Sequence, residues 1–301
     1  MDHPESFGVQ STNRSCHNPT MKSDPIKALA KLASRRKAAP VKATQLSLEL
    51  WPDAVRGVPN AVLRGSLFSV SKVRATAKKR ELLAAVEGIE VRFKGEKFNQ
   101  VDLDLWEMLL HLARLQPLGN QVEFTAYSLL KELGRGTSGK DHEELKEGIA
   151  RLIGGVVEIT WLKEAKTFGG ALVSNFYRDE DKQRYVVTLD PKMVGLYEGG
   201  YSYIDWSRRK ALKGNSLAKW LQGFYASHAH PYPYKVETLR NLCGSTTGRL
   251  GDFRKLLRPA LDELVAVGSI ASWTLDDGDL LHIVNVPTAS QSRHRLRHSV
   301  V

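Results

Sequence analysis

One stretch near the carboxyl end, residues 234–284, constrains the fold more than any other part of the sequence. Apolar side chains recur at helical spacing over residues 236–242 and are followed by Gly244, which predicts a short helix that ends on a glycine. A second apolar stripe with the same period covers residues 250–264 and predicts a longer helix. Two helices joined by a tight turn are therefore expected.

The residues after this helix pair change to the alternating period of strands. Residues 270–275 and 280–284 alternate, and Asp277-Gly278 between them is typical of a hairpin turn. The order helix, turn, helix, hairpin predicts a winged helix-turn-helix. Pro259 lies inside the longer helix, where it removes a backbone donor and predicts a kink or a restart.

Positive charge is concentrated in two parts of this 301-residue chain. The net charge of +11 and the pI near 9.6 indicate a polyanionic partner. Residues 205–258 hold 11 Lys or Arg against 3 Asp or Glu, and residues 1–80 hold 15 against 5, whereas residues 81–204 hold 15 against 20. Because Lys and Arg displace condensed counterions from DNA, the helix pair near the carboxyl end should supply most of the affinity for a duplex.

Nine side chains in and before this helix pair are expected to contact DNA. Residues 206–213 predict a helix whose cations line the DNA backbone, although a solvated connector between domains accounts for them equally well. Two threonines are placed at the start of the longer helix, near base edges or phosphates. The acidic hairpin tip, residues 276–279, would repel phosphate, so we expect it off the DNA or against a partner. The expected DNA-binding residues are Arg208, Arg209, Lys210, Thr246, Thr247, Arg249, Arg254, Lys255 and Arg258.

Three landmarks of this region recur roughly 110 residues earlier, at offsets of 114, 110 and 112. Two copies of one unit explain these offsets economically, whereas two unrelated helical domains would have to share the spacings by chance. The predicted fold class is therefore α+β, with two tandem winged helix-turn-helix domains over residues 61–203 and 204–290. The matching landmarks are Trp106 and Trp220, Leu133-Gly134 and Cys243-Gly244, and Trp161 and Trp273.

The remaining segments are predicted from their own patterns. Residues 1–44 contain too few apolar side chains for a core and predict a disordered basic tail, and residues 291–301 form a carboxyl-terminal tail. Within the first copy, residues 83–86 and 89–93 predict two strands, and residues 124–133 predict one helical stripe.

A short apolar motif, Gln45-Leu46-Ser47-Leu48-Glu49-Leu50, lies in a polar segment that we assign, over residues 45–60, as motif and linker. In extended form Leu48 and Leu50 point the same way, which suits a peptide that inserts two leucines into an apolar pocket. The motif resembles the linear sequence by which replication proteins dock on the bacterial sliding clamp. An edge strand packed on the first domain is the equal alternative. The expected clamp-binding residues are Gln45, Leu46, Leu48 and Leu50.

Several patterns suggest catalysis or metal binding but lack the required context. Gly134 to Asp141 imitates a phosphate-binding loop, yet it follows a helix and is expected to be a turn. His228 and His230 imitate a metal-binding pair, but they end a helix, where solvated residues are expected. Cys16 and Cys243 are expected to be reduced thiols. We therefore expect no catalytic residue, metal or cofactor, no membrane span and a cytoplasmic location.

A family resemblance joins these observations. The chain resembles the TrfA family of plasmid replication initiators from about residue 44 to residue 285. The resemblance implies two winged-helix domains that bind double-stranded origin DNA with direct repeats, help to open the duplex and contact the sliding clamp. It also implies recruitment of host initiator and helicase proteins, and a homodimer is one possible form. The motifs that carry it are Gln45 to Leu50, Trp51-Pro52-Asp53, His230-Pro231-Tyr232-Pro233, Lys235, Glu237, Thr238 and Leu242-Cys243-Gly244-Ser245.

Two departures and one alternative accompany this resemblance. The motif here ends Leu48-Glu49-Leu50, where family members have an aromatic residue directly after the second leucine, which shifts the expected pocket contact by one residue. Pro259 is the second departure, so DNA contacts are placed before it. A transcriptional repressor or copy-control protein with the same fold is the alternative function, because it would need neither the clamp motif nor duplex opening.

Overall fold

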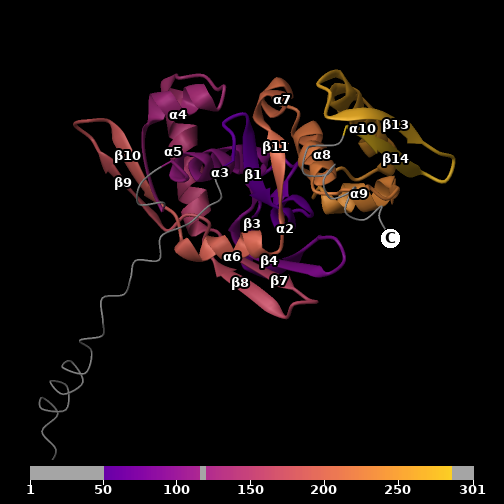
Figure 1. The fold of residues 1–301 in the computed structure, drawn as a ribbon, viewed down its shortest axis with the longest axis horizontal. Helices are drawn as coiled ribbons and strands as arrows, with labels where there is room; N and C mark the ends of the chain where they lie inside the picture. The colour runs from indigo at the N-terminus through magenta and orange to yellow at the C-terminus, as the bar shows by residue number, and fades with distance from the viewer. Residues whose placement is uncertain (1–50, 116–119, 287–301) are drawn as a thin grey trace, which may run out of the picture. The chain divides into compact units, whose positions relative to one another are not determined.

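The computed structural model describes residues 51–115 and 120–286, which form a mixed α/β structure (Figure 1). The basic tail (residues 1–44), the clamp motif (Gln45, Leu46, Leu48 and Leu50) and the tail at residues 291–301 lie outside the described residues. In the described part, none of the helices combines the length and the apolar character that crossing a bilayer requires.

Four sheets belong to the first part of the fold. Strands β3, β4, β7 and β8 form an antiparallel sheet in that order, β6, β10 and β9 form a second, β1 pairs with β11, and β2 pairs in parallel with β5. The strands are β1 (Val55–Pro59), β2 (Phe68–Ser69), β3 (Thr76–Leu83), β4 (Ile89–Glu96), β5 (Phe98–Asn99), β6 (Gln121–Thr125), β7 (Val156–Trp161), β8 (Lys166–Gly170), β9 (Asn175–Asp179), β10 (Arg184–Thr188) and β11 (Tyr201–Asp205).

Helix α3 contributes seven buried apolar residues to the first hydrophobic cluster. Its N-terminus is closed by a capping box, in which the Asn99 side chain accepts from the backbone of Asp102 and the Asp102 carboxylate accepts from the backbone of Asn99. Trp106 in its middle is fully buried and stacks on Phe68. The helices of this part are α2 (Asn60–Leu63), α3 (Gln100–Ala113), α4 (Ala126–Glu132), α5 (Gly139–Gly154), a 3₁₀ turn η1 (Pro191–Met193) and α6 (Val194–Glu198).

Residues 134–138 form a turn between two helices, as predicted, and residues 139–141 begin α5. Gly134 ends the α4 region at a φ of 68°, and Ser138 caps α5 through a box with Asp141. Phe124, expected to start this helical stripe, lies instead in β6, because the alternation of Val122 and Phe124 buries them on one face of a strand.

The carboxyl-terminal part follows the predicted order closely. The helix pair is α9 and α10, Gly244 takes a φ of 64° between them, and the hairpin has its turn at residues 276–279. Helix α10 is continuous through Pro259, so the expected restart is wrong. The elements are α7 (Trp206–Ala211), α8 (Ser216–Ala226), β12 (Tyr234–Lys235), α9 (Val236–Leu242), α10 (Leu250–Ala266), β13 (Ile270–Leu275) and β14 (Leu280–Asn285).

The two parts are alike up to their second helix and differ after it. In the carboxyl-terminal part, the strand before the helix pair (β12) joins the hairpin that directly follows it (β13–β14). In the first part, β7 joins β4, and the strand before the helix pair (β6) joins the later β9–β10 hairpin. The landmark pair Trp161 and Trp273 therefore lies in sheets of different construction.

Two other expectations about the first part are wrong. The segment assigned as a linker is packed from Trp51 onward: Trp51 is 3% exposed, its Nε1 donates to Nδ1 of His111 at 3.2 Å, and β1 pairs with β11. The strand before β4 covers Thr76–Leu83 rather than residues 83–86. Its exposed side chains Lys78, Lys79 and Arg80 gave no apolar alternation from which to recognise it.

Direct contacts connect the second hydrophobic cluster, which covers residues 212–281, to the first part. The Nε1 of Trp220 in α8 donates to the carbonyl of Gly65 at 3.0 Å, and the backbone N–H of Val70 donates to the carbonyl of Cys243 at 2.9 Å. A Cβ at Gly244 would lie 2.8 Å from the Cβ of Ser69. The turn between α9 and α10 is thus held against the chain around β2.

Candidate nucleic-acid interface

Three cations share the exposed side of the second helix pair. Arg249 precedes α10, and Lys255 and Arg258 lie on the side of α10 opposite its buried stripe; all three are exposed. We call Arg249, Lys255 and Arg258 the α10 cation face. The buried stripe that orients it consists of Phe253, Leu257, Ala260, Leu261 and Leu264.

Lys255 forms a weak ion pair within α10. Its side chain is 80% exposed, and Nζ lies 3.0 Å from Oδ1 of Asp252, one turn earlier. An exposed pair of this kind contributes at most about 1 kcal/mol, so a phosphate can replace the carboxylate at little cost.

The two threonines do not begin the helix, contrary to expectation. Helix α10 begins at Leu250, and Arg249 occupies the position before it without a side-chain cap. Ser245 organises the preceding turn: its hydroxyl donates to Oγ1 of Thr247 at 3.0 Å and accepts from the backbone N–H of the same residue. Thr246 is exposed in this turn, whereas the hydroxyl of Thr247 is used within it.

Arg254 also differs from the expectation. Its Nε and Nη2 donate to the two carboxylate oxygens of Asp279, each at 2.8 Å, in a bidentate ion pair between α10 and the hairpin turn. Its charge is thereby matched inside the protein. The Asp279 carboxylate of the acidic hairpin tip is therefore paired within the protein, and Asp276 lies 2.9 Å from Nε2 of His282.

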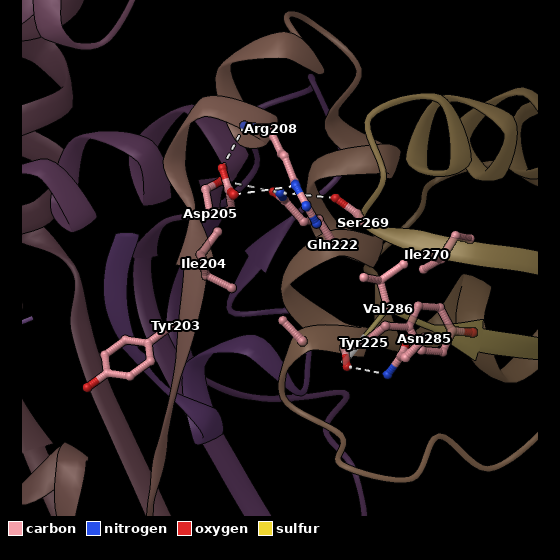
Figure 2. Close-up of a pocket in the computed structure, with 11 residues that line it drawn as sticks. Tyr203, Ile204, Asp205, Arg208, Gln222, Tyr225, Ser269, Ile270, Asn285 and Val286 are labelled. Atoms are coloured by element: carbon pink, nitrogen blue, oxygen red, sulfur yellow. Dashed lines mark hydrogen bonds and ion pairs between the residues drawn. The ribbon is translucent and has the colours of Figure 1, made fainter. Parts of the chain in front are cut away.

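Arg208 is used in the contact between α7 and the carboxyl-terminal part (Figure 2). Its Nη1 donates to the carbonyl of Gly268, and its Nε lies 3.4 Å from Asp205. A cavity of about 40 Å³ beside it is lined by β11, α8 and the hairpin strands. Because one water needs about 10–15 Å³, the cavity has room for a few waters.

Arg209 was expected to contact DNA, and the structure shows that this is wrong. Its side chain is fully buried, with Nε 2.6 Å from Oδ1 of Asp104 and 3.3 Å from Oε2 of Glu107. Its Nη2 donates to Oε1 of Gln100 at 3.0 Å. Lys219 of α8 also contacts Asp104, at 2.6 Å. Of the three consecutive cations of α7, Lys210 is the exposed one.

Sequence reasoning missed one exposed residue of α10. Leu256 is 55% exposed and follows Lys255 in sequence, and the 100° step places it on the flank of α10 between the buried stripe and Lys255. An exposed apolar side chain next to cations suits contact with a thymine methyl group. The 100° step per residue that placed Leu257 in the core could have placed Leu256 outside it.

The corresponding helix of the first part is more acidic: α5 holds four acidic residues against three basic ones, whereas Arg249 and α10 together hold four basic residues against three acidic ones. The exposed face of α5 carries Glu143, Glu144 and Glu147 beside Lys140 and Lys146. A hollow of about 570 Å³ borders it, lined by α5, the start of α3 and the loop between α7 and α8. The two helix pairs are therefore similar in local geometry and different in electrostatics.

Of the two histidines expected to be solvated, His230 is exposed, whereas His228 is not. His228 packs against the rings of Phe224 and Tyr234, and its Nδ1 lies 2.6 Å from the carbonyl of Phe224. Burial lowers the pKa of His228 to about 4, which keeps the ring neutral. Within residues 51–115 and 120–286, no three His, Cys, Asp or Glu side chains gather closely enough to hold a metal ion.

Comparison with known proteins decides the family. The model of the TrfA protein family matches residues 22–285, which is most of the chain. The chain belongs to the TrfA family. A TrfA-family relative from Escherichia coli, the plasmid replication initiator protein TrfA, is 28% identical over 249 residues, which cover 79% of this chain and 65% of that protein. The chain thus matches somewhat less than two thirds of that relative's length.

Solved structures of domains 2 and 3 of RctB share the fold of this TrfA-family chain. One superposes with a TM-score of 0.51 at 12% identity and covers 75% of this chain and 98% of the RctB chain. Another gives the same TM-score at 13% identity, over 78% and 99% of the two chains. At this level of identity the likeness concerns the fold alone.

Proposed function

We propose that this protein is a plasmid replication initiator that binds repeated origin sequences, helps to open the duplex and recruits host replication proteins. Membership of the TrfA family and the likeness to a plasmid replication initiator support the role in replication. The observation that carries duplex binding is the α10 cation face, which leaves three exposed cations on the outer side of a helix pair. Such a face can release counterions from DNA phosphates.

The proposal includes the finer architecture. We assign β6, α4, α5 and the β9–β10 hairpin to one winged helix, and β12, α9, α10 and the β13–β14 hairpin to a second. The shared glycine turn and the strand before each helix pair support this assignment. The second unit then contacts DNA through α10, and the acidic α5 gives the first unit a supporting or self-association role. The protein acts as a DNA-binding protein without catalysis of its own.

The α10 cation face is tested by the salt dependence of duplex binding. In the full-length Lys255→Ala/Arg258→Ala variant, the slope of log K against log salt should become shallower by roughly one to two units, because two phosphate contacts are lost. Fluorescence anisotropy with a labelled duplex at several salt concentrations measures this slope.

Helix α5 supplies the matched control. The Lys140→Ala/Lys146→Ala variant removes two exposed lysines from the corresponding helix of the first part, and we expect its slope to equal that of the wild type. If both variants have the same slope as the wild type, α10 is not part of the DNA interface.

Footprinting on plasmid DNA distinguishes an initiator from a repressor. An initiator is expected to protect direct repeats, whereas a repressor is expected to protect a short palindrome.

Clamp recruitment is the second part of the proposal. The motif Gln45–Leu50 ends immediately before Trp51, whose buried indole holds that point of the chain on the first part. A partner that binds the motif would therefore be brought to the protein surface near α3. Retention on immobilised sliding clamp should be lost in the Gln45→Ala/Leu48→Ala/Leu50→Ala variant. Retention equal to that of the wild type would reject the motif.

A further inference from the structure

Asp279 connects three elements of the carboxyl-terminal part. Its carboxylate accepts both hydrogen bonds from Arg254 of α10, and its carbonyl accepts from the backbone N–H of Val236, the first residue of α9, at 3.0 Å. It closes the β13–β14 turn with a φ of 63° and donates its own N–H to the carbonyl of Asp276 at 3.1 Å. One residue thus fixes the hairpin turn against both helices of the pair.

A second contact supports the same arrangement farther along the hairpin. The Nε1 of Trp273 in β13 donates to Oδ1 of Asp262 in α10 at 3.0 Å. The hairpin is therefore joined to α10 at two places, Arg254 and Asp262, which are eight residues and about 12 Å apart along the helix axis. Two such contacts restrict rotation of the hairpin about the helix as well as its distance from it.

The charges at the turn explain why Arg254 fits this role better than DNA contact. The side chain of Arg254 is 36% exposed and that of Asp279 is 26% exposed, and the fork of the guanidinium is used by both carboxylate oxygens. A phosphate could bind the Nε–Nη2 edge of Arg254 only by displacing Asp279, which would release a carboxylate beside the DNA. Lys255, next in sequence, has an 80% exposed side chain and no such constraint.

We propose that Arg254 and Asp279 are positioning residues, which hold the β13–β14 hairpin at a fixed angle to α10 and thereby determine the DNA sequence preference of the protein. This inference rests on the proposed duplex binding. In it, Arg254 contributes to the choice of sequence through Asp279, while the α10 cation face contributes affinity for any duplex. A hairpin that is free to move would meet the groove beside α10 in several ways, and discrimination between sequences would fall.

The test compares three full-length variants: Arg254→Gln, Asp279→Asn and the double variant. Asparagine is chosen because it tolerates the left-handed backbone conformation at this position. Wild-type protein first selects a preferred duplex from a random-sequence library, and the affinities for that duplex and a scrambled duplex give a specificity ratio. Melting temperatures of all variants confirm that each is folded.

We expect each single change to lower the specificity ratio about tenfold, and the double variant to lose no more than either single variant, because both changes break one contact. The salt slope of Arg254→Gln should remain that of the wild type, whereas the control Lys255→Gln should reduce it by about one unit and weaken both duplexes alike. Three results would overturn the positioning role. They are a salt slope reduced by about one unit in Arg254→Gln, a loss of specificity in the double variant equal to the product of the two single losses, and a specificity ratio that no variant changes. Failure of the wild type to enrich any duplex would instead overturn the proposed function on which it rests.

Discussion

Single residues in the contact between α3 and α7 show how strongly burial decides the role of a charge. Arg209 and Lys210 are neighbours in sequence, yet the first is fully buried between carboxylates and the second is exposed. Asp104 lies closer to Arg209 than Glu107 does, and it also pairs with Lys219. Both carboxylate oxygens of Glu107 are left without a hydrogen bond, so burial raises the pKa of Glu107 to about 7.

Glu107 should therefore make stability depend on pH. Because its folded pKa lies near 7 and its ordinary value is 4.5, the folded state holds a proton that the unfolded state releases between these values. Its contribution is fully present below pH 4.5 and is lost as the pH rises through 7, a change of about 3 kcal/mol. Urea unfolding of the wild type and of Glu107→Gln at pH 4.5 and pH 8 measures it. Relative to pH 4.5, the free energy of unfolding at pH 8 should fall more for the wild type than for the variant. The same difference between the two proteins at both pH values would contradict the raised pKa of Glu107.

At the scale of elements, the turn between α9 and α10 joins local geometry to long-range packing. Gly244 combines a positive φ with close approach to Ser69 and Ser66, so a side chain there meets both backbone strain and the chain around β2. Gly248, in the same turn, has open space around the position of a Cβ.

These two glycines give a matched pair of substitutions. We expect Gly244→Ala to lower the free energy of unfolding by about 2 kcal/mol or more, because it adds the left-handed strain and a clash. Gly248→Ala should change it by less than about 0.5 kcal/mol. Thermal and urea unfolding followed by circular dichroism would compare the two variants. Equal changes in the free energy of unfolding would show that the turn at Gly244 is not packed tightly against the first part.

The elements also show which features the sequence could predict. The α9, α10 and β13–β14 elements were predicted almost to the residue, because their apolar periods and turn residues are local signals. Strand β3 was misplaced because its exposed cations carry no such period. The burial of Arg209 and the pairing of Arg254 depend on Asp104, 105 residues away, and Asp279, 25 residues away, and no local pattern encodes such distant partners.

At the scale of the whole described molecule, two hydrophobic clusters are joined by polar contacts as well as by apolar ones such as those of Val70 and Val86. The first cluster reaches Trp206 and the second begins at Leu212, and between them lie the buried ion pairs of Arg209. Buried pairs of this kind add little net stability when complete, but the loss of one partner leaves an uncompensated charge.

Loss of Arg209 should consequently weaken the connection between the clusters. In Arg209→Met, Asp104 and Glu107 lose their shared cation, and we expect a loss of about 3–5 kcal/mol with a broadened or divided thermal transition. Lys210→Met, the exposed neighbour, should unfold like the wild type. Differential scanning calorimetry of both variants makes the comparison. A single unshifted transition in Arg209→Met would mean that the clusters are held together by their other contacts alone.

The cations of β3 have a consequence for the protein at high concentration. This strand is the outermost member of the β3-β4-β7-β8 sheet, and Lys78, Lys79 and Arg80 stand exposed along it. A second molecule that approached with the same strand would bring like charges into register, which opposes the edge-to-edge pairing that leads to aggregation. The exposed cations that prevented recognition of β3 from the sequence thus oppose polymerisation through this edge strand.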